Sequence, residues 1–101
     1  MAKLRKLEPD EIEERLRAVP DWRIVAGKLR REIRFADFLG AFGFMSALAL
    51  VAESRNHHPE WFNVYGRVVI DWNTHDVGGL SERDFELAAA SDRLAARFGG
   101  E

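Results

Sequence analysis

The alternation of side chains over residues 28–35 constrains the fold more than any other feature of this sequence. The odd-numbered positions are mostly apolar, whereas the even-numbered positions are all charged: Lys28, Arg30, Glu32 and Arg34. Successive side chains of a β-strand point to opposite faces of a sheet, so this strand has one buried face and one face in water. The sheet that contains it is therefore expected to be covered on one side only, as is common for antiparallel sheets.

Two hairpins are expected to build this sheet. The first joins residues 22–25 to residues 28–35 through a tight turn at 26–27, where the sequence is Ala-Gly. The second joins residues 60–65 to residues 67–73 and turns near the glycine between them. One face of the last strand carries the apolar side chains of Val68, Ile70 and Trp72.

Three segments have the spacing of helices. The first begins at Pro9 and is ended by Pro20, because proline suits a first helical turn and cannot continue a helix. The longest covers residues 37–55, and the last follows Ser81 and Asp84, which resemble a capping box. The order is α-β-β-α-β-β-α. We therefore predict an α+β fold, in which three helices pack on one face of a four-stranded antiparallel sheet.

The long helix has a wider apolar arc than one sheet face needs. Its main stripe consists of Phe38, Ala41, Phe42, Met45, Leu48, Ala49 and Ala52, and it is widened by Phe44, Ala47 and Val51. Either the helix is buried in the core or its outer face meets another subunit. We favour the second alternative, because a domain of 101 residues has little material to cover both sides of a helix.

Composition narrows the class of protein. The whole chain, residues 1–101, is long enough for one domain. Its 15 basic and 17 acidic residues are intermingled, so the charge pattern does not indicate binding to nucleic acid or anionic lipid. No apolar run approaches the length of a membrane span, and the N-terminal segment lacks the apolar core of a signal peptide. We therefore expect a cytoplasmic protein. The absence of cysteine excludes disulfides, thiolate nucleophiles and cysteine-based metal sites.

All three histidines lie between residues 57 and 75, and the intervening hairpin can bring them together. His57 and His58 end the long helix, and His75 follows the fourth strand. A lone histidine most often has a surface or structural role, and this adjacent pair could simply end the helix. Histidine can also act as an acid or a base near neutral pH. Polar residues and one aromatic residue surround this candidate site: Glu53, Asn56, Thr74, Asp76, Asp84 and Trp61.

Other chemistries fit the sequence less well. Zinc accepts nitrogen and oxygen ligands, but adjacent side chains project in different directions, so His57 and His58 would not readily share one ion, and no HExxH motif is present. A serine nucleophile would need a Gly-x-Ser-x-Gly elbow, which is absent. Gly78 and Gly79 form no phosphate-binding motif, and we expect them to let the backbone approach something flat. Acid–base chemistry by imidazole, without a cofactor, remains.

The same residues resemble the active-site pattern of the pterin-4a-carbinolamine dehydratases. Three residues separate Glu53 from His57, and eight separate His75 from Asp84, as in that family. The pattern also includes His58, Pro59 and Tyr65. Three further segments are similar to the animal members: AFGFM (41–45), HHPEWFNVY (57–65) and GLSERD (79–84).

The resemblance implies an activity and an assembly. The family dehydrates 4a-hydroxytetrahydrobiopterin, the pterin-4a-carbinolamine left by aromatic amino-acid hydroxylases, to the quinonoid dihydropterin. This reaction needs a positioned base and a positioned acid, and no metal or redox cofactor. Family members form homodimers through sheet edges and homotetramers through their long helices, which here corresponds to the helix over residues 38–52. Which of the two states this chain adopts stays open, as does the side chain of its natural pterin.

The resemblance also implies roles for individual residues. His57 and His75 are the candidate acid and base, in an order that stays open, and His58 binds and orients the substrate. Asp84 orients His75 or caps the last helix. The other candidate substrate contacts are Glu53, Asn56, Pro59, Trp61, Asn73, Thr74 and Asp76. An alternative function is that of a non-catalytic dimerisation cofactor for a transcription factor or an assembly partner, but a purely binding role would not need the complete histidine set.

Overall fold

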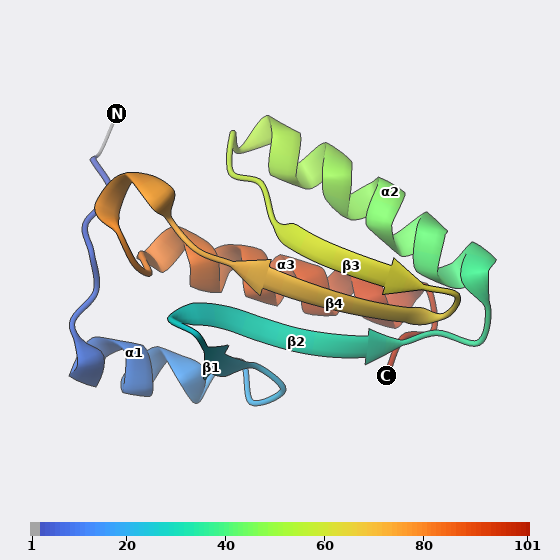
Figure 1. Ribbon diagram of the computed structural model, residues 1–101, viewed down its shortest axis with the longest axis horizontal. Helices are drawn as coiled ribbons and strands as arrows, with labels where there is room; N and C mark the ends of the chain where they lie inside the picture. The colour runs from blue at the N-terminus through green and yellow to red at the C-terminus, as the bar shows by residue number, and fades with distance from the viewer. Residues whose placement is uncertain (1–2) are drawn as a thin grey trace.

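The computed structural model describes residues 3–101 and has the predicted order of elements (Figure 1). Along the chain these are α1 (Pro9–Leu16), β1 (Arg23–Val25), β2 (Lys28–Arg34), α2 (Phe38–Ser54), β3 (Glu60–Val64), β4 (Arg67–Trp72), the 3-10 turn η1 (His75–Val77) and α3 (Glu82–Arg97). The four strands form one antiparallel sheet in the order β1-β2-β4-β3. The predicted α+β class is confirmed.

One face of the sheet is buried by helices. Leu29 pairs with Trp72 across β2 and β4, Ile33 pairs with Val68, and all four side chains are fully buried. In Figure 1, α3 lies behind the central strands and α2 runs beside β3. The helix residues buried against this face include Phe44, Leu48, Leu87 and Ala88. The first helix, α1, packs partly buried apolar side chains at the margin of the same core.

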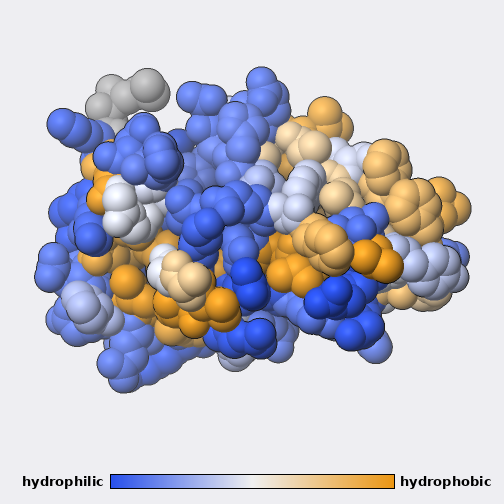
Figure 2. All heavy atoms as spheres, viewed as in Figure 1, coloured by the Kyte–Doolittle hydropathy of each residue, from blue (hydrophilic) through white to orange (hydrophobic). Residues whose placement is uncertain are grey.

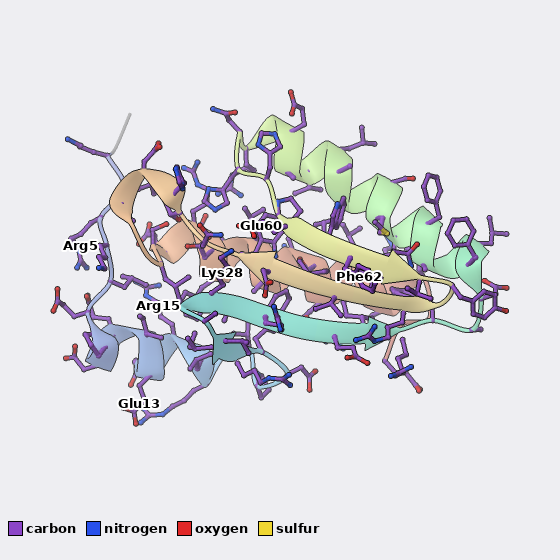
Figure 3. All side chains as sticks on the ribbon, in the orientation of Figure 1. Arg5, Glu13, Arg15, Lys28, Glu60 and Phe62 are labelled. Carbon is purple, nitrogen blue, oxygen red and sulfur yellow. The ribbon has the colours of Figure 1, made fainter. Side chains whose placement is uncertain are left out.

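The other face of the sheet carries charged side chains on β2, as the alternation predicted, and the exposed apolar side chains of Phe62 and Val64 on β3. Arg30 of β2 forms a bidentate pair with Asp71 of β4, at 2.8 and 2.9 Å. Lys28 reaches across β4 to Glu60 of β3, with 2.6 Å between Nζ and Oε1. Figure 3 shows Lys28, Glu60 and Phe62 on this face. Because these charges are satisfied by cross-strand partners, the face is stable without a helix over it.

Two details of the helices differ from the sequence prediction. α1 ends at Leu16 rather than just before Pro20, because the following turn tightens and directs Val19 into the core, where it is 2% exposed. In α2 the buried residues are Ala41, Phe44, Leu48 and Ala52. Phe38 and Phe42, which were predicted in the same stripe, are instead 49% and 53% exposed. The apolar arc is therefore divided between the core and the surface.

The exposed side of α2 forms an apolar surface. It consists of Phe38, Leu39, Phe42 and Leu50. Figure 2 shows apolar atoms gathered at the end of the molecule where α2 begins. Within residues 3–101, no helix combines the length and the apolar character that crossing a bilayer requires.

Candidate active site

The end of α2 places two histidines beside the sheet. Asn56 adopts a left-handed conformation, with φ of 49°, which asparagine tolerates better than most residues. The backbone N–H of His57 then donates to the carbonyl of Ala52 at 3.1 Å, which closes the helix in a Schellman-like arrangement. Pro59 prevents the helix from continuing. The predicted break after Arg55 thus turns His57 inward and leaves His58 at the surface.

His57 is buried and held by two partners. Its ring is 8% exposed and stacks on the indole of Trp72, with 5.9 Å between the ring centroids. Its Nε2 lies 2.7 Å from Oδ1 of Asp84, which is fully buried. A carboxylate only accepts hydrogen bonds, so Nε2 of His57 is the donor, and in a neutral imidazole the lone pair then lies on Nδ1. Of the two roles expected for Asp84, capping of the last helix is confirmed, whereas the histidine that Asp84 contacts is His57 and not His75.

Asp84 is itself fixed by a buried hydrogen-bond network. Its Oδ2 accepts from the Thr74 hydroxyl at 2.7 Å and from the backbone N–H of Ser81 at 2.9 Å. The hydroxyls of Thr74 and Ser81 are 2.6 Å apart and hydrogen bonded to each other. Ser81 and Asp84 form the predicted capping box of α3. The same carboxylate therefore begins a helix and orients a candidate catalytic histidine.

The other two histidines are exposed. His58 Nε2 is 2.8 Å from Oε1 of Glu53, one turn earlier along α2, and both side chains are largely in solvent. His75 opens the η1 turn, and its ring makes no hydrogen bond within residues 3–101. The strand β4 and the helix α2 end on the same side of the molecule, so all three histidines lie together, as predicted.

All three histidines line a cavity of about 610 Å³. It is large enough for a bicyclic heterocycle, since ligand pockets typically measure roughly 300–1,000 Å³. The residues that line it are Leu4, Ser54, Arg55, Asn56, His57, His58, Asn73, Thr74, His75, Asp76 and Arg83. Seven of these eleven were predicted as site residues.

Four predicted site residues do not line the cavity. Glu53 contacts His58 from outside, and Asp84 lies behind His57. Pro59 belongs to the turn that ends α2. Trp61 packs partly buried against the hydrophobic core, on the inner face of β3, so the structure gives no support for its stacking on a bound ring.

Sequence reasoning missed four lining residues. Arg83 donates from Nη1 to the carbonyl of Arg55 at 3.1 Å, and this contact holds the end of α2 against α3. Ser54 and Arg55 line the cavity because the chain turns there. Leu4 comes from a segment with no recognisable motif. The GLSERD segment includes Arg83, so that residue could have been found from the sequence, whereas nothing in the sequence marked Leu4.

Charged groups border the site near His75. Glu60 accepts hydrogen bonds from Lys28 and from Asn73 Nδ2, the latter at 2.9 Å. These two bonds, with a smaller contribution from the nearby His75, lower the pKa of Glu60 below its usual value. Asn73, which lines the cavity, is thereby held by an anion. Within residues 3–101, no three side chains of His, Cys, Asp or Glu are placed to hold a metal ion.

The fold and the site together define a small α+β protein whose cavity is equipped for acid–base chemistry by histidine. A family model described as pterin 4 alpha carbinolamine dehydratase matches residues 5–94. The chain belongs to this family, which confirms the resemblance seen in the sequence.

Individual relatives agree with this assignment. A protein of Solibacter usitatus assigned to the pterin-4-alpha-carbinolamine dehydratases is 58% identical over 91 residues, which cover 90% of this chain and 96% of the relative. One from Burkholderia vietnamiensis with the same assignment is 50% identical over 95 residues, covering 92% and 93%. The crystal structure of a transcriptional coactivator/pterin dehydratase from Brucella melitensis is similar, with a TM-score of 0.86, 42% identity, and coverage of 89% of this chain and 98% of that one.

Proposed function

We propose that this protein dehydrates 4a-hydroxytetrahydrobiopterin to the quinonoid dihydropterin by histidine acid–base catalysis, and so supports pterin recycling for aromatic amino-acid hydroxylases. Family membership supports the activity. The observation that carries the mechanism is the buried contact of 2.7 Å between His57 and Asp84, at the wall of a cavity that His75 also lines.

His57 is proposed as the base. It donates Nε2–H to Asp84, so Nδ1 is the nitrogen that can accept the proton on N5 of the pterin. The buried carboxylate then stabilises the imidazolium that forms, as in other histidine–carboxylate pairs. Loss of the N5 proton allows a double bond to form between N5 and C4a while the hydroxyl leaves C4a.

His75 is proposed as the acid. It donates a proton to the departing 4a-hydroxyl, which leaves as water, and its exposure to solvent lets it recover a proton between turnovers. His57 releases its own proton to solvent, so the cycle is balanced. His58 is proposed to bind and orient the substrate, together with Asn56, Asn73, Thr74 and Asp76. None of these steps needs a cofactor.

The mechanism is tested by measuring dehydration of the 4a-hydroxytetrahydropterin above its uncatalysed background. His57→Ala and His75→Ala should each lower kcat by about 10²–10⁴-fold, the usual contribution of one acid or base. His58→Ala should mainly raise KM. Arg34→Gln is the control, because Arg34 is the last residue of β2 and does not line the cavity. This variant should leave kcat and KM unchanged. Near wild-type kcat in both folded His57 and His75 variants would refute the mechanism.

We also propose that the protein self-associates through the apolar surface of α2 and the edge strand β3. Four large side chains on α2 are at least 49% exposed, β3 adds Phe62 and Val64, and the turn after β3 adds Tyr65. Apolar side chains that gather on one surface in this way commonly mark a protein–protein interaction site. Light scattering should give the molecular mass of a dimer or a tetramer, and Phe42→Glu should lower the molecular mass of the assembly. A monomeric wild-type protein would contradict this proposal.

The alternative is a binding function without catalysis. The name of the Brucella melitensis structure joins a transcriptional coactivator to a pterin dehydratase, and the apolar surface of α2 could accept a helix of another protein. The complete histidine set and its buried carboxylate favour catalysis. The two functions are distinguished by the turnover assay together with a pull-down with candidate helical partners.

The cytoplasmic location expected from the sequence stays a prediction.

A further inference from the structure

The N-terminal arm, residues 3–7, contributes one wall of the cavity. Leu4 is half-buried, and within residues 3–101 it is the only cavity-lining residue with a purely hydrocarbon side chain. A pterin forms hydrogen bonds around its ring edge, but its two faces need apolar contact to leave water. With Trp61 turned into the core, Leu4 is the side chain on the cavity wall that supplies such contact.

Contacts at the following residues hold this arm in place. The N–H of Leu7 donates to the carbonyl of Leu80 at 2.8 Å, and the side chain of Leu7 is 4% exposed. Arg5 forms a bidentate pair with Glu11 of α1, at 2.9 and 2.7 Å. Figure 3 places Arg5 on this segment, which in Figure 1 passes beside the η1 turn. These contacts anchor the segment of chain that directly follows Leu4.

The arm also packs against the loop that carries His75. A Cβ atom added to Gly79 would lie 2.9 Å from Cε of Lys6, so the missing side chain makes room for the arm. The carbonyl of Gly79 accepts from the N–H of Thr74 at 2.8 Å, one residue before His75. Gly79 thus lies against a lysine of the same chain, and the expectation that Gly78 and Gly79 let the backbone approach something flat stays a prediction.

We propose that the N-terminal arm is part of the pterin site and that Leu4 contacts a face of the bound ring. Leu4 excludes water from the side of the cavity where the histidines exchange protons. This inference rests on the proposed function, because it assigns a substrate contact for the same reaction. The side chain of Leu4 carries no acidic or basic group, so it acts only through substrate binding.

The test compares substitutions that differ in apolarity and in volume. Leu4→Ala removes apolar area, and Leu4→Asn keeps the branched shape but makes the side chain polar; each should raise KM roughly tenfold, as expected for several tens of Å² of lost apolar contact. The change in kcat should stay below about threefold, because no proton-transferring group is altered. Leu4→Met should restore a KM close to that of the wild type.

Two further variants separate the contact from general loss of structure. Glu11→Gln removes the charge that holds Arg5 but keeps an oxygen for the N–H of Glu8, and it should raise KM by a smaller factor, about two- to fivefold. Ile24→Ala, at a 40% exposed apolar residue outside the cavity, should change nothing.

Binding is measured independently by titration calorimetry with 7,8-dihydrobiopterin as a product-like probe, and it should weaken by the same factor as KM rises. If Leu4→Ala and Leu4→Asn bind and turn over within twofold of the wild type, the inference is overturned while the proposed function stands. A wild-type protein that neither binds the probe nor dehydrates the substrate would instead overturn the proposed function.

Discussion

The substitution Asp84→Asn tests the orientation of His57 most directly. Asp84 is fully buried and accepts three hydrogen bonds, from His57, Thr74 and the N–H of Ser81. Asparagine has nearly the same shape, but one of its two terminal atoms is a donor. It therefore cannot satisfy all three donors at once.

Both orientations of the new amide impair catalysis. If its oxygen faces His57, the tautomer is kept, but the charge that stabilises the imidazolium is lost; a charged hydrogen bond contributes about 1.5–3 kcal/mol, or roughly 10–150-fold in rate. If its nitrogen faces His57, Nε2 must accept and the proton moves to Nδ1, which removes the base and costs about 10²–10⁴-fold. We expect kcat to fall by about 10²–10³-fold, with KM changed only a few-fold.

The assay is steady-state dehydration of the 4a-hydroxytetrahydropterin, with circular dichroism and urea unfolding to confirm the fold. The first orientation also leaves the N–H of Ser81 without an acceptor, so a stability loss of about 0.5–2 kcal/mol is expected. Asp92→Asn is the matched control, because Asp92 lies on the same helix and accepts from Trp22 at 2.8 Å and from Arg31 at 2.6 Å. It should lose stability without losing kcat. A folded Asp84→Asn protein with kcat within threefold of the wild type would refute the reasoning.

Two further predictions concern stability. Gly66→Ala should destabilise the protein by about 1–3 kcal/mol in urea unfolding, because its Cβ would lie 2.4 Å from the carbonyl oxygen of Phe35; Gly40→Ala, whose nearest contacts are at 3.4 Å, should be neutral or stabilising. Hydrogen bonds, chiefly from Arg5, lower the pKa of Glu11 from 4.5 to about 2. The resulting stabilisation is present above pH 4.5 and lost toward pH 2, so the difference in stability between the wild type and Glu11→Gln should shrink across that interval; a constant difference would contradict the pairing.

Local patterns in the sequence predicted most of the fold. The alternation over residues 28–35 predicted a sheet with one polar face, and this face carries the cross-strand ion pairs. The Asn-His-His-Pro segment predicted the end of the long helix, and Ser81 with Asp84 predicted the start of the last one. These predictions hold because strand alternation, helix capping and proline geometry depend on neighbouring residues alone.

Predictions that depended on packing were less accurate. The sequence placed Phe38 and Phe42 in the same stripe as Leu48, whereas the core accepts Phe44 in their place. Helical spacing gives the relative directions of side chains, but the sheet and α3 decide which direction is inward. The same limit explains Trp61, whose inward direction was set by the register of β3 on β4.

The amino-acid sequence by itself determined the α+β fold, through the alternation of side chains in the strands and the cap of the last helix. It also determined that the three histidines follow the ends of the long helix and of the fourth strand. Its tertiary structure decided which histidine receives the buried carboxylate and which apolar residue meets the cavity. Asp84 contacts His57 across 27 positions, and Leu4 reaches the cavity from the opposite end of the chain. Such contacts are absent from local patterns because they arise only when separate elements pack against each other.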